Sequence, residues 1–378
     1  MLLVTLELQD FRNVERAELS PGPRTTVLVG RNGQGKTNLL EAVYLLCTLR
    51  PLRAARLAEL VRFGASRAVV AGGFQGPGGL RRAAVEVADG NRTAFLDGKP
   101  LAAGAGLVDY FEGRAAVCFS PDDLLLVKGG PELRRRFLDR AAFNRWPAVL
   151  AEAREYLQAL RARNAALRHG APGVEESFRP PLARAAARLW RRRRELLAEL
   201  SPRVAAAFAA ISGPGAPPAL LAYRPAAGLR LDGAEPELEA RLEEVLAQRL
   251  ARDRERGYTS AGPHADDLVL AVGEHGARPF ASQGQQRALV LALKIGEIEN
   301  LRAALGRPPL LLLDDVSSEL DPEKNRYLLE YLARLPGQAI LTTTDRRLLE
   351  PAAGPDALFY GVEGGRLRPL DSPANPGA

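Results

Sequence analysis

The sequence predicts an α/β fold built around a glycine-rich loop, with a mainly helical segment inserted into it. A β-branched, apolar run at Thr25 to Val29 leads through a glycine-rich loop into a run of helical spacing. Strand-like patterns dominate the first third of the chain and return after Gly257, whereas helical periodicity dominates the middle. A second apolar run, Leu310 to Leu313, has the length of a buried parallel strand and ends in two acids.

The loop at residues 30–37 fits the phosphate-loop pattern G-x-x-x-x-G-K-[ST] without a mismatch. Glycines let backbone N–H groups converge on phosphate oxygens, and the N-terminus of the following helix adds positive potential. Lys36 is expected to reach the β- and γ-phosphates of ATP, and the Thr37 hydroxyl to ligate Mg²⁺. A chance match is the alternative in a chain with 36 glycines, but lysine is rare among the basic residues here. The predicted nucleotide-binding residues of this segment are Gly30, Arg31, Asn32, Gly33, Gln34, Gly35, Lys36, Thr37 and Asn38.

Length and composition describe a globular chain of about two domains. The chain has 378 residues, of which 46% are hydrophobic and 26% charged. Its first nine residues alternate like a strand and show no signal peptide, and no apolar run approaches the roughly 18 residues that span a bilayer. Cys47 and Cys118 lie in apolar segments and are expected to be reduced core thiols. A cytoplasmic protein without membrane contact is therefore expected.

The formal net charge of +7 favours an anionic partner such as nucleic acid. The competing interpretation is a compositional bias toward arginine spread over the surface. Aromatic residues make up only 6% of the chain, which argues against stacking on single-stranded bases. Contact with the backbone of duplex DNA needs only positive charge and is the easier mode to reconcile with this composition.

Three consecutive segments are predicted: 1–125 as the N-terminal part of an ATPase head, 126–255 as a helical lobe and 256–378 as the C-terminal part of the head. Strands are expected at residues 2–9, 25–29, 67–74, 82–87, 92–96, 115–119 and 267–272. Helices are expected at residues 122–127, 131–143, 147–169, 175–210 and 236–255. Pro180, Pro181 and Pro202 are expected to interrupt the fourth of these helices. The short link at 170–173 predicts that the two long helices form an antiparallel pair.

The two acids that follow the 310–313 strand complete the expected ATP site. Ligands of open α/β sheets bind at the carboxyl ends of the strands, which is where these acids lie. Asp314 is expected to hold Mg²⁺ together with Thr37, and Asp315 to orient or deprotonate the attacking water. The alternative is a strand that ends at a turn with two capping acids.

The segment Ser282-Gln283-Gly284-Gln285-Gln286-Arg287 opens a helix with Ser282 at its N-cap. A serine hydroxyl and free N–H groups at a helix N-terminus form a second anion site. Since one phosphate loop needs only one such site, a head-to-tail pair is the economical solution, in which this helix end closes on the γ-phosphate held by a second copy. An ordinary capped helix is the competing interpretation.

Four motifs together resemble the ABC-type ATPases, in the variant of the SMC and double-strand-break repair heads. They are Gly30–Thr37 as phosphate loop, Ser282–Arg287 as signature, Leu310–Asp315 as second acidic motif and Ser318–Asp321 as D-loop. Further strings resemble the bacterial RecF family specifically: Phe11-Arg12-Asn13, Ser120–Leu124, Lys128–Pro131 with Arg134-Arg135, and Thr259–Asp267. The resemblance implies an ABC-type ATPase head, with mixed sheets around a central helix, that binds ATP and Mg²⁺. It also implies ATP-dependent dimerisation, DNA binding and recombinational repair with RecO and RecR.

The resemblance adds Ser282, Gly284 and Gln285 to the nucleotide site across the dimer, and places Asn13 near the adenine or ribose. It assigns catalytic roles to Asp315, Lys36, Ser282 and Thr344. Thr344 stands where ABC enzymes have a switch histidine, and threonine cannot take up a proton near neutrality. Asp315 replaces the usual glutamate. Slow hydrolysis that acts as a switch is therefore expected.

Several basic residues leave two interpretations open. The four arginines of Trp190–Arg194 form either a solvated helix face or a DNA contact. Arg50, Arg53 and Arg56 are candidates for a DNA or cross-dimer contact, or form an exposed basic loop. His264 is expected to be a loop residue bonded to backbone rather than a catalytic base or a zinc ligand.

The sequence thus favours a DNA-repair ATPase that dimerises on ATP, binds duplex DNA at single-strand gaps and helps to load a recombinase. One alternative is the soluble ATPase subunit of an ABC transporter. Against it, the inserted segment is arginine-rich and mainly helical. A structural SMC-like protein is the other alternative, and the insert lacks the hundreds of heptad residues that such proteins carry.

Overall fold

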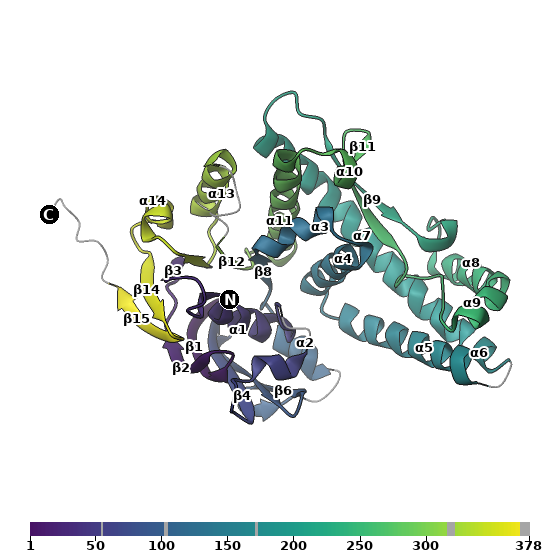
Figure 1. The fold of residues 1–378 in the computed structure, drawn as a ribbon, viewed down its shortest axis with the longest axis horizontal. Coiled ribbons are helices and arrows are strands. Elements are labelled where there is room, and N and C mark those ends of the chain that lie inside the picture. Colours follow the sequence, from purple (N-terminus) through teal and green to yellow (C-terminus); the bar gives the residue numbers. More distant parts are fainter. Residues whose placement is uncertain (54–55, 102–104, 171–172, 316–321, 371–378) are drawn as a thin grey trace. The chain divides into compact units, whose positions relative to one another are not determined.

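The computed structural model describes residues 1–53, 56–101, 105–170, 173–315 and 322–370. They form two compact units (Figure 1). The first consists of Met1–Asp123 and Ile298–Ala378, and the second of Leu124–Glu297. The second unit extends past the predicted lobe boundary at residue 255, so the strand at 267–272 and the signature segment group with the helices.

The first unit contains a mostly parallel sheet with the strand order β15-β14-β3-β13-β12-β8. Its strands are β3 (Thr25–Val29), β8 (Ala116–Phe119), β12 (Leu310–Leu313), β13 (Ala339–Thr343), β14 (Leu358–Glu363) and β15 (Arg366–Leu370). Only β15 runs antiparallel to its neighbour. β12 is buried along its whole length, as its unbroken leucine run predicts. The carboxyl ends of β3, β13 and β12 lie side by side, so the residues that follow them meet at one edge.

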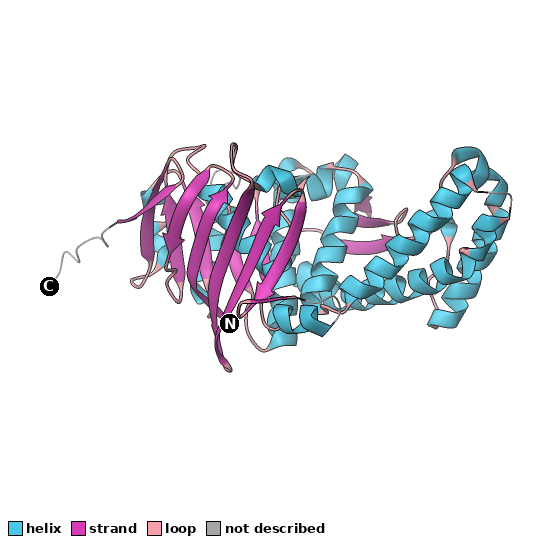
Figure 2. Cartoon of the chain, turned by 90° about the horizontal axis from the view of Figure 1, so that it is seen from below, coloured by secondary structure: helices cyan, strands magenta, loops and turns pink. Residues whose placement is uncertain are grey.

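An antiparallel sheet with the order β2-β1-β4-β5-β6-β7 forms the second layer of this unit. Figure 2 shows strands of the unit as adjacent magenta arrows. The sheet consists of β1 (Leu2–Phe11), β2 (Val14–Leu19), β4 (Arg67–Gly76), β5 (Gly79–Ala88), β6 (Asn91–Leu96) and β7 (Lys99–Pro100). In β5, buried residues alternate with more exposed ones, as in a sheet that has one covered face. The sequence missed β2 and the two strands β14 and β15.

Helix α1 (Lys36–Thr48) is the central helix of the first unit. It packs against β1, β4 and β5 of the antiparallel sheet and against β8, β12 and β13 of the parallel sheet. Its side chains are buried on every face, which explains why its apolar residues form no single stripe. The expected ABC-type head, with mixed sheets around a central helix, is therefore confirmed.

Gln338, just before β13, ties the two sheets together. Its side-chain oxygen accepts the N–H of Leu3 on β1 at 2.9 Å, and its side-chain nitrogen donates to the carbonyls of Leu3 and Gly22 at 2.8 and 2.7 Å. The side chain is only 3% exposed, so its hydrogen bonds replace water that it lost on folding. The remaining elements of this unit are η1 (Leu57–Leu60), α2 (Ala105–Phe111), η2 (Pro121–Leu124), α13 (Pro322–Arg334), η4 (Arg346–Leu348) and α14 (Glu350–Ala353).

Helices dominate the second unit. They are α3 (Leu125–Lys128), α4 (Pro131–Arg145), α5 (Val149–His169), α6 (Val174–Ser177), α7 (Arg179–Ser212), α8 (Glu235–Gln248), α9 (Leu250–Arg256), α10 (Ala277–Phe280) and the larger part of α11 (Gln283–Leu305). A small antiparallel sheet of β9 (Ala219–Arg224), β10 (Asp267–Val272) and β11 (His275–Gly276), together with the turn η3 (Ala226–Gly228), accompanies them. β9 lies outside every predicted strand.

Helices α5 and α7 form the predicted antiparallel pair. Arg192 bonds to Glu152, and Arg188 to Glu155 one turn further along α5, so residue numbers rise on one helix as they fall on the other.

Two helical predictions were wrong. Pro202 lies inside α7 without ending it, because packing outweighs the one backbone hydrogen bond that proline removes. The predicted helix 236–255 is broken at Arg249, whose backbone leaves the helical region.

Within the described residues, none of the helices combines the length and apolarity that crossing a bilayer demands.

Candidate functional site

The glycine-rich loop connects β3 to α1 at the carboxyl edge of the parallel sheet. A side chain at Gly30 would place its Cβ 2.4 Å from the carbonyl oxygen of Val362, so only glycine fits there. Gly33 and Gly35 have φ values of 80° and 108°, which strain any L side chain. A Cβ at Gly35 would also lie 2.9 Å from the side-chain oxygen of Asn13. Backbone strain and close approach therefore both account for the glycines of the motif.

Lys36 is the first residue of α1 and is 6% exposed. Its ammonium donates to the carbonyls of Gly30 at 2.6 Å and Arg31 at 3.0 Å, so it lies inside the curl of the loop. Burial lowers the pKa of Lys36, while the nearby carboxylates of Asp315 and Asp314 raise it. The loop thus holds a partly desolvated positive charge at its centre.

Thr37 and Asp314 meet at the edge of the sheet. The Thr37 hydroxyl donates to Oδ1 of Asp314 at 2.7 Å, and Asp314 is 2% exposed. The same oxygen accepts the hydroxyl of Thr342, at the end of β13, at 3.0 Å. Thr342 in turn accepts the backbone N–H of Asp315 at 2.9 Å. The sequence did not single out Thr342, whose side chain fixes both acids.

Asp315 follows directly and is partly buried. Its φ of 46° is unusual for a residue other than glycine. The left-handed backbone turns the chain away from the line of β12 immediately after Asp314, so the two consecutive acids differ in surroundings. The predicted D-loop, Ser318–Asp321, lies outside the described residues.

Arg53, whose role the sequence left open, contacts an acid of the site. Its guanidinium lies 2.5 Å from Oδ2 of Asp314. The backbone N–H groups of Leu52 and Arg53 both donate to Oε1 of Glu41 on α1, at 3.0 and 2.9 Å. Oε2 of Glu41 accepts Arg12 at 2.8 Å, and Glu41 is 1% exposed. A buried carboxylate on the central helix therefore fixes the backbone that carries Arg53.

The rim of the loop brings several predicted residues together. Asn13 accepts a hydrogen bond from Asn38 at 2.7 Å, and Gln34 accepts the N–H of Gly364 at 2.7 Å. Arg31 and Asn32 are exposed at the loop tip. Thr344 is exposed beyond the end of β13. These placements leave polar groups around the mouth of the loop.

The signature segment belongs to the second unit and forms a capped helix start. The Ser282 hydroxyl accepts the N–H of Gln285 at 3.2 Å, and the Gln285 side chain accepts the N–H of Ser282 at 2.9 Å. This reciprocal pair is a capping box. Gly284 lies half-exposed in the first turn of α11. Gln286, only 7% exposed, donates to the carbonyls of Ala277 and Ala281 and fixes the segment before the helix.

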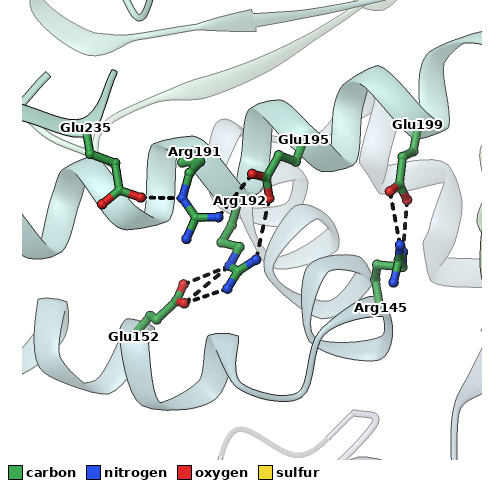
Figure 3. A network of polar contacts seen from close by, with 7 residues as sticks. All are labelled: Arg145, Glu152, Arg191, Arg192, Glu195, Glu199 and Glu235. Carbon is green, nitrogen blue, oxygen red and sulfur yellow. Dashed lines mark hydrogen bonds and ion pairs between the residues drawn. The ribbon is translucent and has the colours of Figure 1, made fainter. Parts of the chain in front are cut away.

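The arginine run of α7 makes internal contacts, so neither interpretation from the sequence describes it fully. Arg191 bonds to Glu235 and Glu195, and Arg192 to Glu152 and Glu195 (Figure 3). Figure 3 also shows the parallel pair of contacts between Arg145 and Glu199. Arg193 is buried and donates to Asp139 and to Tyr223. Three of the four arginines thus form ion pairs with carboxylates of the same unit.

The Thr259–Asp267 string is a buried polar node of the second unit. His264 contacts the Thr259 carbonyl at 2.9 Å and the Tyr156 hydroxyl at 2.5 Å, which confirms a loop histidine satisfied within the protein. Asp266 accepts the Trp190 ring N–H at 2.6 Å and the Tyr223 hydroxyl at 2.7 Å. Its fully buried surroundings raise its pKa.

Comparison with known proteins places these features in one family. Residues 2–89 match the family model described as the RecF/RecN/SMC N-terminal domain. The DNA replication and repair protein RecF of Anaeromyxobacter dehalogenans (strain 2CP-C) is 72% identical over 98% of this chain and 100% of its own length. RecF of Myxococcus xanthus (strain DK1622) is 54% identical over 97% of both chains.

Solved structures show the same similarity. The recombination mediator protein RecF with ATP, in the RecFOR pathway, superposes with a TM-score of 0.86 at 28% identity and covers 98% of this chain and 97% of its own. An SMC head bound to the C-terminal winged-helix domain of ScpA shares the fold, with a TM-score of 0.57 at 17% identity over 99% of this chain and 98% of that one. Because relatives of high identity match over nearly its whole length, the chain belongs to the RecF family.

Proposed function

We propose that this protein is an ATP-dependent DNA-binding protein of recombinational repair that acts in the RecFOR pathway. It closes as a homodimer on two ATP molecules, binds duplex DNA at single-strand gaps and helps to load the recombinase. The observation that carries the proposal is the 2.7 Å hydrogen bond between Thr37 of the phosphate loop and the buried Asp314. It joins the two halves of a Mg²⁺–ATP site that lie far apart in the sequence.

The proposed nucleotide site uses the residues of the loop in separate roles. Lys36 binds the β- and γ-phosphates, and its carbonyl partners Gly30 and Arg31 are exchanged for phosphate oxygens. A threonine hydroxyl and a carboxylate are the hard oxygen donors that Mg²⁺ prefers, so Thr37 and Asp314 fit this ion. The bound ion offsets phosphate charge. Backbone N–H groups of residues 31–37 and the side chains of Asn13 and Asn38 line the rest of the site.

Hydrolysis is proposed to be slow and to act as a switch. Asp315 orients the attacking water and accepts its proton. Thr344, exposed at the end of β13, bonds to the γ-phosphate without taking up a proton. The N-terminus of α11 in a second copy closes the site. There, Ser282, Gly284 and Gln285 of the second copy contribute a hydroxyl and N–H groups to the γ-phosphate.

The proposed partners are duplex and gapped DNA, a second copy of the chain, and RecR together with RecO. The net charge of +7 supports a DNA backbone contact. The arginines of α7 that face Glu152, Glu195 and Glu235 are poor candidates, because a phosphate must displace a carboxylate to reach them. Full-length relatives named for DNA replication and repair favour this function over a transporter subunit.

Sedimentation velocity with ATP, with ADP and without nucleotide, each with and without duplex DNA, tests the proposal. We expect a dimer only with ATP or a non-hydrolysable analogue. Lys36→Met should remain a monomer, while Lys99→Met, at an exposed lysine on β7, should dimerise like the parent protein. Ser282→Arg should bind ATP and stay a monomer. A parent protein that remains a monomer when saturated with the analogue would overturn the proposal.

A further inference from the structure

Phe280 is an exposed aromatic side chain immediately before the signature helix. With 71% of its surface accessible, it is the most exposed large apolar residue among the described residues of its unit. Its ring centroid lies 5.4 Å from that of His275, which is also exposed. The two rings form an aromatic pair at the surface, called here the 275/280 pair.

The backbone that carries the 275/280 pair is fixed. Phe280 ends the short helix α10, whose first residue, Ala277, is fully buried. The buried side chain of Gln286 donates to the carbonyls of Ala277 and Ala281, at 3.4 and 3.1 Å. Side-chain hydrogen bonds from the signature helix thus hold the turn on both sides of Phe280. Phe280 is therefore exposed while its backbone is held in one conformation. An exposed phenylalanine in a fixed position is a candidate contact residue.

The position of Phe280 along the chain points to the surface that the 275/280 pair contacts. Phe280 stands two residues before Ser282, the cap of the helix end that is proposed to close on the γ-phosphate of a second copy. A surface beside that helix end faces the second copy when the dimer closes. Ser282 and the helix N–H groups supply hydrogen bonds to phosphate but little apolar area. Stable interfaces also bury aromatic side chains at their centre, and the 275/280 pair is an exposed aromatic surface beside this helix end.

We infer that the 275/280 pair is the apolar contact of the ATP-dependent dimer and packs against the head of a second copy beside its phosphate loop. The inference rests on the proposed function, since it needs the head-to-tail pair. In a two-fold dimer each contact occurs twice, so a single substitution removes both. The pair accordingly sets the strength of dimerisation and leaves nucleotide binding by each chain unchanged.

Three variants at exposed positions test this contact. Phe280→Ala removes the ring, Phe280→Trp keeps an aromatic surface, and Leu157→Ala truncates an exposed apolar residue of α5, 44% accessible, as a matched control. Sedimentation equilibrium with a non-hydrolysable ATP analogue gives the dimer dissociation constant, and a fluorescent analogue gives nucleotide affinity. For Phe280→Ala we expect the dissociation constant to rise about tenfold or more, while the nucleotide affinity of the monomer, measured at protein concentrations well below that constant, stays unchanged. Phe280→Trp should restore dimerisation, and its added indole should shift its emission to the blue when the dimer forms.

Equal dimerisation of Phe280→Ala and the Leu157→Ala control overturns the inference, and so does weaker nucleotide binding by the Phe280→Ala monomer at protein concentrations below the dimer dissociation constant. A tryptophan at 280 whose emission stays unchanged on dimerisation also overturns it. Failure of the proposed function gives a different result, because then the parent protein and all three variants stay monomeric with the analogue. If Ser282→Arg blocks dimerisation and Phe280→Ala does not, the result supports the proposed dimer and contradicts the proposed aromatic contact.

Discussion

Arg53 and Asp314 form an ion pair of 2.5 Å, so the acid proposed to serve Mg²⁺ carries a guanidinium from its own chain. Arg53 is 38% exposed at its side chain, whereas Asp314 is 3% exposed. Glu41 holds the backbone beside Arg53 through two N–H groups. The acid of the pair is therefore buried, whereas the guanidinium of Arg53 is close enough to solvent to move away from it.

Replacement of Arg53 should ease the binding of Mg²⁺. In Arg53→Gln no cation competes for Oδ2 of Asp314, so the Mg²⁺ concentration for half-maximal binding of a fluorescent ATP analogue should fall, by roughly threefold to tenfold. Arg62→Gln is the matched control, since Arg62 pairs with Asp10 at 2.7 Å and is 37% exposed. A rise in the required Mg²⁺ would show that Arg53 assists binding instead.

Asp315→Asn should separate ATP binding from hydrolysis. The amide keeps the size of the side chain but cannot accept the proton of the attacking water, so the single-turnover rate should fall by about a hundredfold or more. ATP should still bind, and the dimer should persist after ATP is added. Quenched-flow measurement of the rate, with sedimentation after the same delay, checks both expectations. Dissociation at the parental rate would rule out Asp315 as the base.

The polar node around His264 should make stability depend on pH. Burial lowers the pKa of His264 below its ordinary value of about 6.5, so the folded protein binds its proton less readily than the unfolded chain. This histidine therefore stabilises the fold above pH 6.5, and the contribution is lost as pH falls through its folded pKa. The melting temperature of the parent protein, measured from pH 5 to pH 8, should fall more steeply on acidification than that of His264→Gln. Parallel curves would mean that His264 titrates equally in both states.

Arg114 should be replaceable without loss of stability. It is 4% exposed and lies over the rings of Phe74 and Tyr110, at 5.2 and 5.0 Å. Among the described residues, its Nε and Nη1 have no hydrogen-bond partner, and burial lowers its pKa. Arg114→Met keeps much of the volume and removes the desolvated charge, so the free energy of unfolding should stay equal or rise by about 1 kcal/mol. Urea denaturation measures it, and a loss above 1 kcal/mol would show that the cation–π contacts outweigh the desolvation cost.

Local patterns predicted the elements that position the site. The β-branched run at 25–29, the glycine loop and the leucine run at 310–313 each carry their own signal, and parallel pairing then forces their ends together. This is why the meeting of Thr37 and Asp314 could be foreseen from residues 277 positions apart.

Contacts made by single side chains over long separations could not be foreseen in the same way. Arg53, Thr342 and Gln338 act through partners that only the folded chain selects. Their residue types are common on surfaces, so the sequence contains no signal for them. The arginines of α7 show the reverse case, since their charge was visible and their carboxylate partners were not. The break in the helix at Arg249 and the continuity of α7 through Pro202 likewise depend on packing.

Gln338 has a mechanical consequence for the head. Two of its three hydrogen bonds go to Leu3 on β1 and so tie one sheet to the start of β13 in the other, at a point shielded from water, while the third goes to Gly22. The two layers on either side of α1 therefore resist shear at this seam. We therefore expect a small tilt of β13, whose far end bears Thr342, the partner of Asp314 and Asp315 on the neighbouring strand, to reach the antiparallel layer as well.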